Sequence, residues 1–209
     1  MAQTSSRIDT RRRKAVDTFR SAAHTIGTIE KDMHLFAITR GQFSMIDAIL
    51  ACLDQTGPAA LSVWTWTVAE YEVQCLKRLQ MDDRLTSARL IIDVNAKKRN
   101  AEIIANWRRN FGPTSVRYTI NHAKIATIET DEYRLLLRGS MNLNCNPRFE
   151  QLDISEGGPA FDLIRRTEDE MPYCDDASSH AEVWASAKIE TAFSPDQLQL
   201  FNPSKVWAK

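Results

Sequence analysis

The sequence has no long apolar run, no excess of either charge and no internal repeat. None of its apolar stretches approaches the roughly 20 residues that a membrane-spanning helix needs. Lysine and arginine together number 27, as do aspartate and glutamate. Because the net charge is zero, overall electrostatics do not favour nucleic acid, and any such binding must depend on local patches. The 209 residues are enough for one domain with a sizeable core.

Paired cysteine motifs are also missing. The four cysteines, Cys52, Cys75, Cys145 and Cys174, are scattered along the chain and match no zinc spacing. The sequence shows no secretory leader, so we expect reduced thiols and a cytoplasmic protein. Cys145 is close to Asn142 in the sequence, and we expect it to be an inert buried thiol.

Apolar periodicity predicts alternating helices and strands in one domain, residues 8–192. Helices are predicted over 8–29, 42–53, 69–79, 100–111, 160–170 and 178–192. Strands are predicted over 33–39, 61–68, 88–94, 115–120, 133–137 and 149–154, with a further strand that carries His122 and ends at a polar turn, 130–132. This order predicts an α/β fold with a mixed, mostly parallel sheet and helices on both faces. Residues 1–7 are expected to be disordered, and 193–209 to form a short C-terminal tail.

Several residues have both a binding interpretation and a structural one. The basic run Arg11–Lys14 suits a phosphate backbone or a solvated helix face equally well. Trp64 and Trp66 point to one face of a strand, where they would stack on bases or pack in a core or interface. Ligands in open α/β sheets bind at strand ends. The residues at predicted strand ends are Thr39, Arg40, Thr65, Trp66 and Thr67. His180 has no partner motif and is expected at the surface.

The segment from Asn121 to Glu150 is the most informative part of the sequence. His122 and Lys124 are two residues apart, so on a strand they would point to the same face. After the polar turn, the predicted return strand ends at the run Gly139-Ser140-Met141-Asn142. A hairpin of this kind brings His122, Lys124, Ser140 and Asn142 to one end of a sheet.

These residue types suit one kind of chemistry. A neutral imidazole can attack phosphorus as a nucleophile. An ammonium group and a side-chain amide can hold the non-bridging oxygens and stabilise the charge that develops in the transition state. Gly139 would let the backbone approach a phosphate closely. The set needs no metal and no other cofactor. The alternative is a structural His122 within the sheet and a solvated Lys124.

The segment resembles the signature of the phospholipase D superfamily, His-x-Lys-x4-Asp followed by Gly-Ser-x-Asn. His122 and Lys124 match its first part, and the run from Gly139 to Asn142 matches its second part. Glu129 stands at the position of the signature Asp, which is mostly a structural support in that family. The gap from Glu129 to Gly139 is also longer than usual, as a longer hairpin turn would produce. The family's usual downstream carboxylate would be Glu150.

The resemblance implies a phospholipase D-like fold and a metal-independent phosphodiesterase. Longer members of the family carry two copies of the motif, so a single copy implies a homodimer. One His122 would form a phosphohistidine, and His122 of the partner subunit would act as general acid and then as base. Lys124 and Asn142 would bind the phosphate with support from Ser140. Glu150 is expected to hydrogen-bond a ring nitrogen of His122.

The C-terminal tail carries a second resemblance. Gln197, Leu198, Leu200 and Phe201 match the Gln-Leu-x-Leu-Phe peptide with which bacterial proteins bind the replicative sliding clamp. Two leucines and a phenylalanine would supply the buried anchors, and the glutamine a polar contact. The alternative is an apolar tail that folds back on its own domain, with Phe193, Val206 and Trp207.

Two functions of different classes follow from the sequence. The first is a DNA nuclease, active as a homodimer and recruited to the clamp. The second is a non-catalytic DNA-binding or adaptor module that uses the same phosphate site, as a decayed site would. Hydrolysis of a phospholipid is less favoured, because the sequence offers no apolar entry surface.

Overall fold

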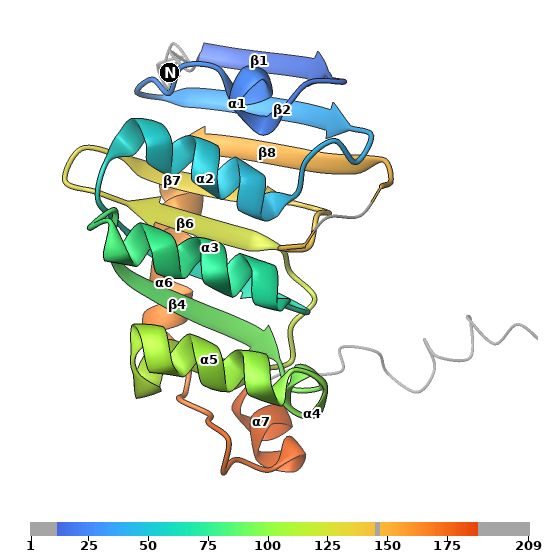
Figure 1. The fold of residues 1–209 in the computed structure, drawn as a ribbon, viewed down its shortest axis with the longest axis vertical. Coiled ribbons are helices and arrows are strands. Elements are labelled where there is room, and N and C mark those ends of the chain that lie inside the picture. The colour runs from blue at the N-terminus through green and yellow to red at the C-terminus, as the bar shows by residue number, and fades with distance from the viewer. Residues whose placement is uncertain (1–11, 145–146, 188–209) are drawn as a thin grey trace, which may run out of the picture.

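The computed structural model describes residues 12–144 and 147–187. Within these residues a single eight-stranded sheet has the strand order β1-β2-β8-β7-β6-β3-β4-β5 (Figure 1). The strands are β1 (Arg12–Asp17), β2 (Met33–Thr39), β3 (Ala59–Thr65), β4 (Leu85–Asp93), β5 (Val116–Thr119), β6 (Ile125–Glu129), β7 (Arg134–Gly139) and β8 (Glu150–Glu156). The predicted α/β class and mixed sheet are confirmed.

Parallel pairs do not predominate, which corrects one part of the prediction. Strands β6, β7 and β8 follow one another along the chain and pair antiparallel. They are inserted between β2 and β3, with which β8 and β6 also pair antiparallel. Only β1–β2, β3–β4 and β4–β5 are parallel among the described pairs. The hairpin that carries the sequence motif therefore lies in the middle of the sheet.

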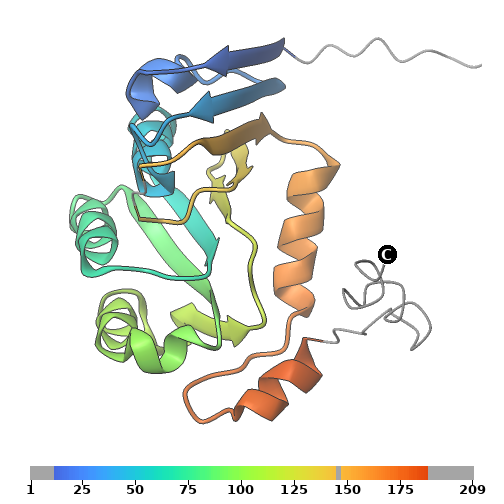
Figure 2. The ribbon, with the colours of Figure 1, turned by 90° about the vertical axis from the view of Figure 1, so that its right-hand side faces the viewer.

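Helices cover both faces of the sheet, as predicted. In Figure 2, α1, α2, α3 and α5 lie on one side and α6 lies on the other. The helices are α1 (Ala22–Ile26), α2 (Met45–Thr56), α3 (Glu70–Met81), α4 (Ala96–Arg99), α5 (Ala101–Phe111), α6 (Pro159–Glu170) and α7 (His180–Ser186), with a 3-10 turn, η1 (Pro113–Ser115). Buried side chains from these helices and from the sheet form one apolar core.

The prediction of a helix over 8–29 is wrong for the residues that the structure describes. Its middle part is strand β1, which pairs parallel with β2 along its whole length, and only Ala22–Ile26 is helical. Pairing with an edge strand outweighed the helical spacing of the apolar residues. The basic residues Arg13 and Lys14 consequently lie on an edge strand, and the Lys14 ammonium donates to the carbonyl of Thr25 at 2.9 Å.

One edge of the sheet collects the ends of β2, β3, β4 and β7 and the starts of β6 and β8, and we call it the carboxyl edge. The strand register defines it, because Trp64 near the end of β3 is opposite Ile125, and Thr39 is opposite Glu150. Helix α2 begins at this edge. Its backbone N–H groups at Met45 and Ile46 donate to carbonyls of the loop after β7.

Helix α6 is held to the sheet by Glu168, whose side chain is 0% exposed. The carboxylate accepts hydrogen bonds from the Ser62 hydroxyl at 2.6 Å and the Trp64 indole N–H at 2.7 Å. The guanidinium groups of Arg89 and Arg165 donate to it at 2.9 and 3.0 Å. A buried carboxylate is tolerated only when it is paired and hydrogen-bonded in this way. Trp64 therefore has a packing role.

None of the helices within residues 12–144 and 147–187 is long and apolar enough to cross a membrane. In the same ranges, no group of three or more His, Cys, Asp or Glu side chains is placed to hold a metal ion. Cys52, Cys75 and Cys174 are free thiols, and burial raises the pKa of Cys52 to about 12. Cys145 and the predicted segments 1–7 and 193–209 lie outside the described residues.

Candidate functional site

A short loop between β5 and β6 carries His122, and the buried Asn121 holds this loop in place. The Asn121 backbone N–H donates to the carboxylate of Asp93 at 3.0 Å, and its side-chain amide donates to the carbonyl of Thr65 at 3.0 Å. Its side-chain oxygen accepts from the backbone N–H of Ala123 at 2.8 Å. Because Thr65 and Asp93 end β3 and β4, the loop is fixed to two neighbouring strands at the carboxyl edge.

His122 and Lys124 are brought together, but not on a strand as predicted. Both precede β6, which begins at Ile125. The ammonium nitrogen of Lys124 lies 3.1 Å from Nδ1 and 3.3 Å from Nε2 of the His122 ring, and it donates to the His122 carbonyl at 2.7 Å. The buried polar contacts of Asn121 determine the backbone conformation of this loop, and a pattern of alternating residues cannot predict such contacts. The pair is accessible, because the His122 side chain is exposed.

Partial burial lowers the pKa of the Lys124 ammonium, and the negative charge of Glu150 opposes that shift. Burial acts because it removes water from the charged form, whereas a nearby carboxylate stabilises the same form. Glu150 is thus close enough to Lys124 for its charge to affect the pKa of the ammonium group. A second anion at this position, such as a phosphate, would further favour the ammonium.

Ser140 and Glu150 form the next part of the site. The Ser140 hydroxyl donates to the Glu150 carboxylate and accepts from the backbone N–H of Gln151 at 2.9 Å. The hydrogen bond predicted between Glu150 and a ring nitrogen of His122 is not found among the described residues, where the ring contacts Lys124 instead. Ser140 is closer to Glu150 in the fold because β7 and β8 are adjacent strands.

Glycine is needed at position 139 for a structural reason that the sequence alone did not reveal. A Cβ atom at this position would lie 2.0 Å from the carbonyl oxygen of Gln151 in β8. Glycine is therefore required for the close approach of β7 and β8, whereas the predicted reason was a close approach to phosphate. The Gly139 N–H also donates to the carbonyl of Lys124 at 3.1 Å, which ties the end of β7 to the loop of the histidine.

Asn142 lies in the loop after β7, and its backbone and side chain have different surroundings. Its backbone carbonyl accepts from the N–H of Met45 at the start of α2, at 3.4 Å. Its side-chain oxygen is buried and has no hydrogen-bond partner among residues 12–144 and 147–187. Most buried polar atoms in proteins are paired, and this oxygen is one of several unpaired side-chain atoms in the part of the chain that the structure describes.

The sequence predicts Trp66 as a strand-end residue, but it does not single out Arg99, which lies beside it. The Trp66 ring lies 6.4 Å from the His122 ring between centroids, with the two planes inclined at 54°. The guanidinium carbon of Arg99, the last residue of α4, lies 4.3 Å from the Trp66 ring centroid. The available signal was the basic run Lys97-Lys98-Arg99, which follows a predicted strand at the edge where ligands bind.

Glu129 lies away from the other predicted site residues. It is the last residue of β6, opposite Ala60 near the start of β3, and so at the other edge of the sheet. Its carboxylate pairs with Arg165 of α6 at 3.3 Å. Since β6 separates it from His122 by the length of the strand, it can support packing but cannot contact the same phosphate.

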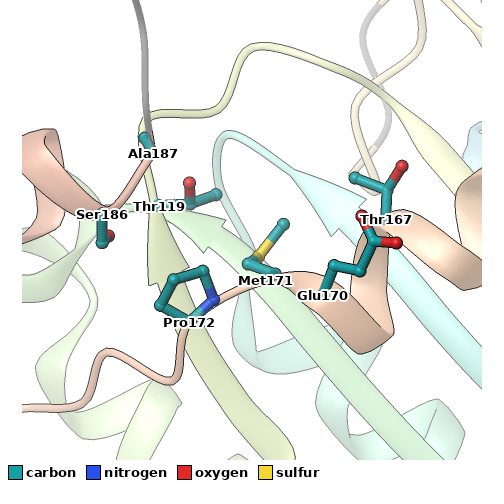
Figure 3. A pocket seen from close by; sticks show the side chains of 7 residues that line it. All are labelled: Thr119, Thr167, Glu170, Met171, Pro172, Ser186 and Ala187. Carbon is teal, nitrogen blue, oxygen red and sulfur yellow. The ribbon is translucent and has the colours of Figure 1, made fainter.

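A cavity of about 200 Å³ lies between the end of β5 and the loop after α6 (Figure 3). Thr119, Glu170, Met171 and Ser186 are among the residues that line it. None of the predicted site residues within 12–144 and 147–187 is in its wall. The chemistry predicted from the sequence is therefore associated with the exposed loop that carries His122 and not with this cavity.

No model of a known protein family matches the chain, and no curated protein matches it in sequence. The resemblance to the phospholipase D superfamily thus remains a prediction based on the motif. The clamp-binding-like residues Gln197, Leu198, Leu200 and Phe201 lie outside the described residues.

Proposed function

We propose that this chain is a phosphodiesterase that cleaves DNA without a metal ion, in the cytoplasm and as a homodimer with a phospholipase D-like fold. The observation that carries the proposal is the contact between the His122 ring and the Lys124 ammonium, 3.1 Å from Nδ1, at the exposed carboxyl edge. An imidazole and an ammonium in contact supply a nucleophile and a cation to one phosphate. The Glu150 carboxylate, which accepts a hydrogen bond from Ser140, acts electrostatically on Lys124.

The proposed reaction has two displacements. A ring nitrogen of His122 attacks phosphorus, a P–N bond forms, and the P–O bond to the leaving strand breaks. His122 of the partner subunit gives its proton to the departing oxygen. Water then attacks phosphorus, the P–N bond breaks, and the same partner imidazole takes the proton from the water. Both histidines return to their first state.

Lys124 would bind a non-bridging oxygen of the phosphate throughout this sequence. Asn142 would bind another through its side-chain NH₂ group, which carries two hydrogen-bond donors. DNA is favoured over a lipid by Trp66 and Arg99 beside His122, since a ring and a guanidinium suit a base and a phosphate. The sliding-clamp-like tail also favours DNA.

The test is a cleavage screen of single-stranded DNA, double-stranded DNA, RNA and a generic phosphodiester, with chelator present throughout. We expect cleavage of at least one DNA substrate by the native chain and by His180→Ala, which removes an exposed histidine on α7. His122→Ala should be inactive on every substrate. Full chelator-resistant activity of His122→Ala would overturn the assignment.

Subunit mixing tests the homodimer. When inactive His122→Ala is added in excess and allowed to exchange, each native subunit pairs mostly with a variant that lacks the second imidazole. Activity per native subunit should then fall toward zero. If it stays constant, one histidine is sufficient and the two-subunit mechanism is wrong.

A second function is favoured by the contacts of Glu150. Its carboxylate engages Ser140 and, in the described residues, does not orient the His122 ring. A histidine without an orienting partner suits a non-catalytic DNA-binding or adaptor module that holds phosphate with Lys124. A native chain that binds DNA but cleaves none of the four substrates would select this function.

Recruitment to the replicative sliding clamp is tested separately. The native chain should retain the purified clamp in a pull-down, and Leu200→Ala with Phe201→Ala should release it. Lys205→Ala is the control, because it lies in the same tail outside the matched peptide. Equal recovery of clamp by all three proteins would reject the clamp-binding interpretation.

A further inference from the structure

Phe19, Arg40 and Phe149 form a cluster at the carboxyl edge that the proposed reaction does not use. The guanidinium carbon of Arg40 lies 4.5 Å from the ring centroid of Phe19 and 4.6 Å from that of Phe149. The three residues come from the loop after β1, the end of β2 and the residue before β8. We call this cluster the Phe–Arg–Phe stack.

The arginine of the stack is fixed, whereas the two rings are open to solvent. Arg40 pairs with Asp17 at 2.7 Å, and its backbone N–H donates to the side chain of Gln42 at 2.8 Å. Phe19 is 68% exposed and Phe149 is 69% exposed. Two exposed phenylalanines on one anchored cation contribute little to the core, and exposed apolar groups gathered in this way commonly mark a binding surface.

The stack adjoins the candidate site. Phe149 directly precedes Glu150, whose carboxylate holds the Ser140 hydroxyl. Arg40 directly follows Thr39, which is opposite Glu150 in the strand register. A chain of nucleotides with one phosphate at His122 and Lys124 would therefore continue along the carboxyl edge toward the stack. This placement rests on the proposed function.

Charge and ring chemistry indicate the ligand. Each exposed phenylalanine has an exposed arginine as its chain neighbour, Arg20 beside Phe19 and Arg148 beside Phe149. Alternating rings and cations match a polymer that presents flat bases and phosphates in turn. A duplex keeps its base faces stacked inside, so only an unpaired strand can offer them to a ring. We propose that the Phe–Arg–Phe stack binds unpaired bases of single-stranded nucleic acid beside the phosphate site.

The test is binding, measured by fluorescence anisotropy in chelator, in the His122→Ala background so that no cleavage intervenes. The ligands are oligothymidylate of about 12 nucleotides, an abasic strand of the same length, and a duplex. Phe149→Ala should weaken oligothymidylate binding by at least about fivefold, the lower end of the effect of losing one base stack. Binding of the abasic strand should be unchanged, because it has phosphates but no bases.

Conservative variants separate a ring from an apolar side chain. Phe149→Tyr keeps the ring and should bind oligothymidylate as Phe149 does, whereas Phe149→Leu should behave as Phe149→Ala. Tyr173→Ala is the control, since Tyr173 is 45% exposed and its hydroxyl donates to the carbonyl of Pro113, away from the site. It should leave all three affinities unchanged. Unchanged secondary structure in circular dichroism would show that each variant is folded.

Three outcomes would overturn the inference. They are equal oligothymidylate affinity for Phe149→Ala and its parent, an equal loss on the abasic strand, and a change of particle size in Phe149→Ala, which would make the stack a protein–protein contact. Failure of the proposed function gives a different result, because the native chain would then cleave no substrate. The preference for oligothymidylate over the abasic strand is measured separately, and its presence or absence tests only the stack.

Discussion

Two clusters of charged side chains lie in different parts of this molecule and are built in opposite ways. Around Glu168, a fully buried carboxylate accepts hydrogen bonds from two neutral donors and two guanidinium groups. Around His122 and Lys124, the groups are accessible, and the buried side-chain oxygen of Asn142, in the loop after β7, has no partner among the described residues. A satisfied buried cluster stabilises the fold, whereas an open and incompletely paired one is suited to a ligand.

The largest expected effect is on activity, at the open cluster. His122→Ala should lower the cleavage rate by at least about a thousandfold, the scale of losses when a covalent nucleophile is removed. Its free energy of unfolding should change by less than about 0.5 kcal/mol, because the side chain is exposed. The measurements are cleavage in chelator and urea unfolding. A destabilisation of several kcal/mol would mean that His122 is structural.

The opposite result is expected at the buried cluster. Glu168→Ala should lower the free energy of unfolding by about 3–5 kcal/mol, because it leaves the Arg89 and Arg165 guanidinium groups without their shared carboxylate. Urea unfolding measures this loss. Glu170→Ala, an exposed carboxylate on the same helix, is the control and should change stability by less than about 0.5 kcal/mol. Similar free energies of unfolding for both variants would show that the cluster around Glu168 does not stabilise the fold.

A smaller effect is expected where the site meets the sheet. Gly139→Ala places a Cβ atom 2.0 Å from the Gln151 carbonyl oxygen, so β7 and β8 must move apart. The cost should be about 1–3 kcal/mol of unfolding free energy, as for other overpacked positions. Nucleic-acid affinity should fall as well, because the Gly139 N–H also ties β7 to the Lys124 carbonyl. Unchanged thermal stability would show that the strands are not close-packed here.

The smallest expected effect concerns pH. Burial lowers the pKa of Lys124, so its ammonium loses a proton at a lower pH than an ordinary lysine does. DNA affinity should therefore decrease as the pH rises, and the decrease should begin below the range, at about pH 10.4, in which an ordinary lysine titrates. The loss should be at most about fivefold for one partly exposed ionic contact. Lys124→Arg should remove this dependence, because a guanidinium stays charged throughout the range. A steep decrease that persists in Lys124→Arg would assign the titration to another group.

Much of the fold follows from patterns within single segments. The apolar runs at 33–39 and 88–94 correspond to strands β2 and β4, and the helical spacing at 42–53 and 100–111 corresponds to α2 and α5. The segment 8–29 was not predictable in the same way. Its strand exists because β2 offers an edge for pairing, which is a long-range contact that no local pattern contains.

The site shows the same division. Spacing alone predicted that His122, Lys124, Ser140 and Asn142 would gather at one end of the sheet, because a hairpin brings the ends of its two strands together. The assignment of Glu150 came from the family resemblance. Spacing did not predict the partner of Glu150, which depends on the register of β7 and β8. The contact between Trp66 and His122 depends on the bonds of Asn121 to β3 and β4, which join segments distant in the sequence.

The central claim is that the exposed imidazole of His122 becomes covalently bonded to phosphorus. The direct measurement is a rapid quench, at neutral or alkaline pH, of the native chain with end-labelled DNA in chelator, followed by peptide mapping. We expect an acid-labile label on the peptide that contains His122, absent from His122→Ala and retained in His180→Ala. Cleavage by the native chain without any such label, or with the label on another residue, would contradict the claim.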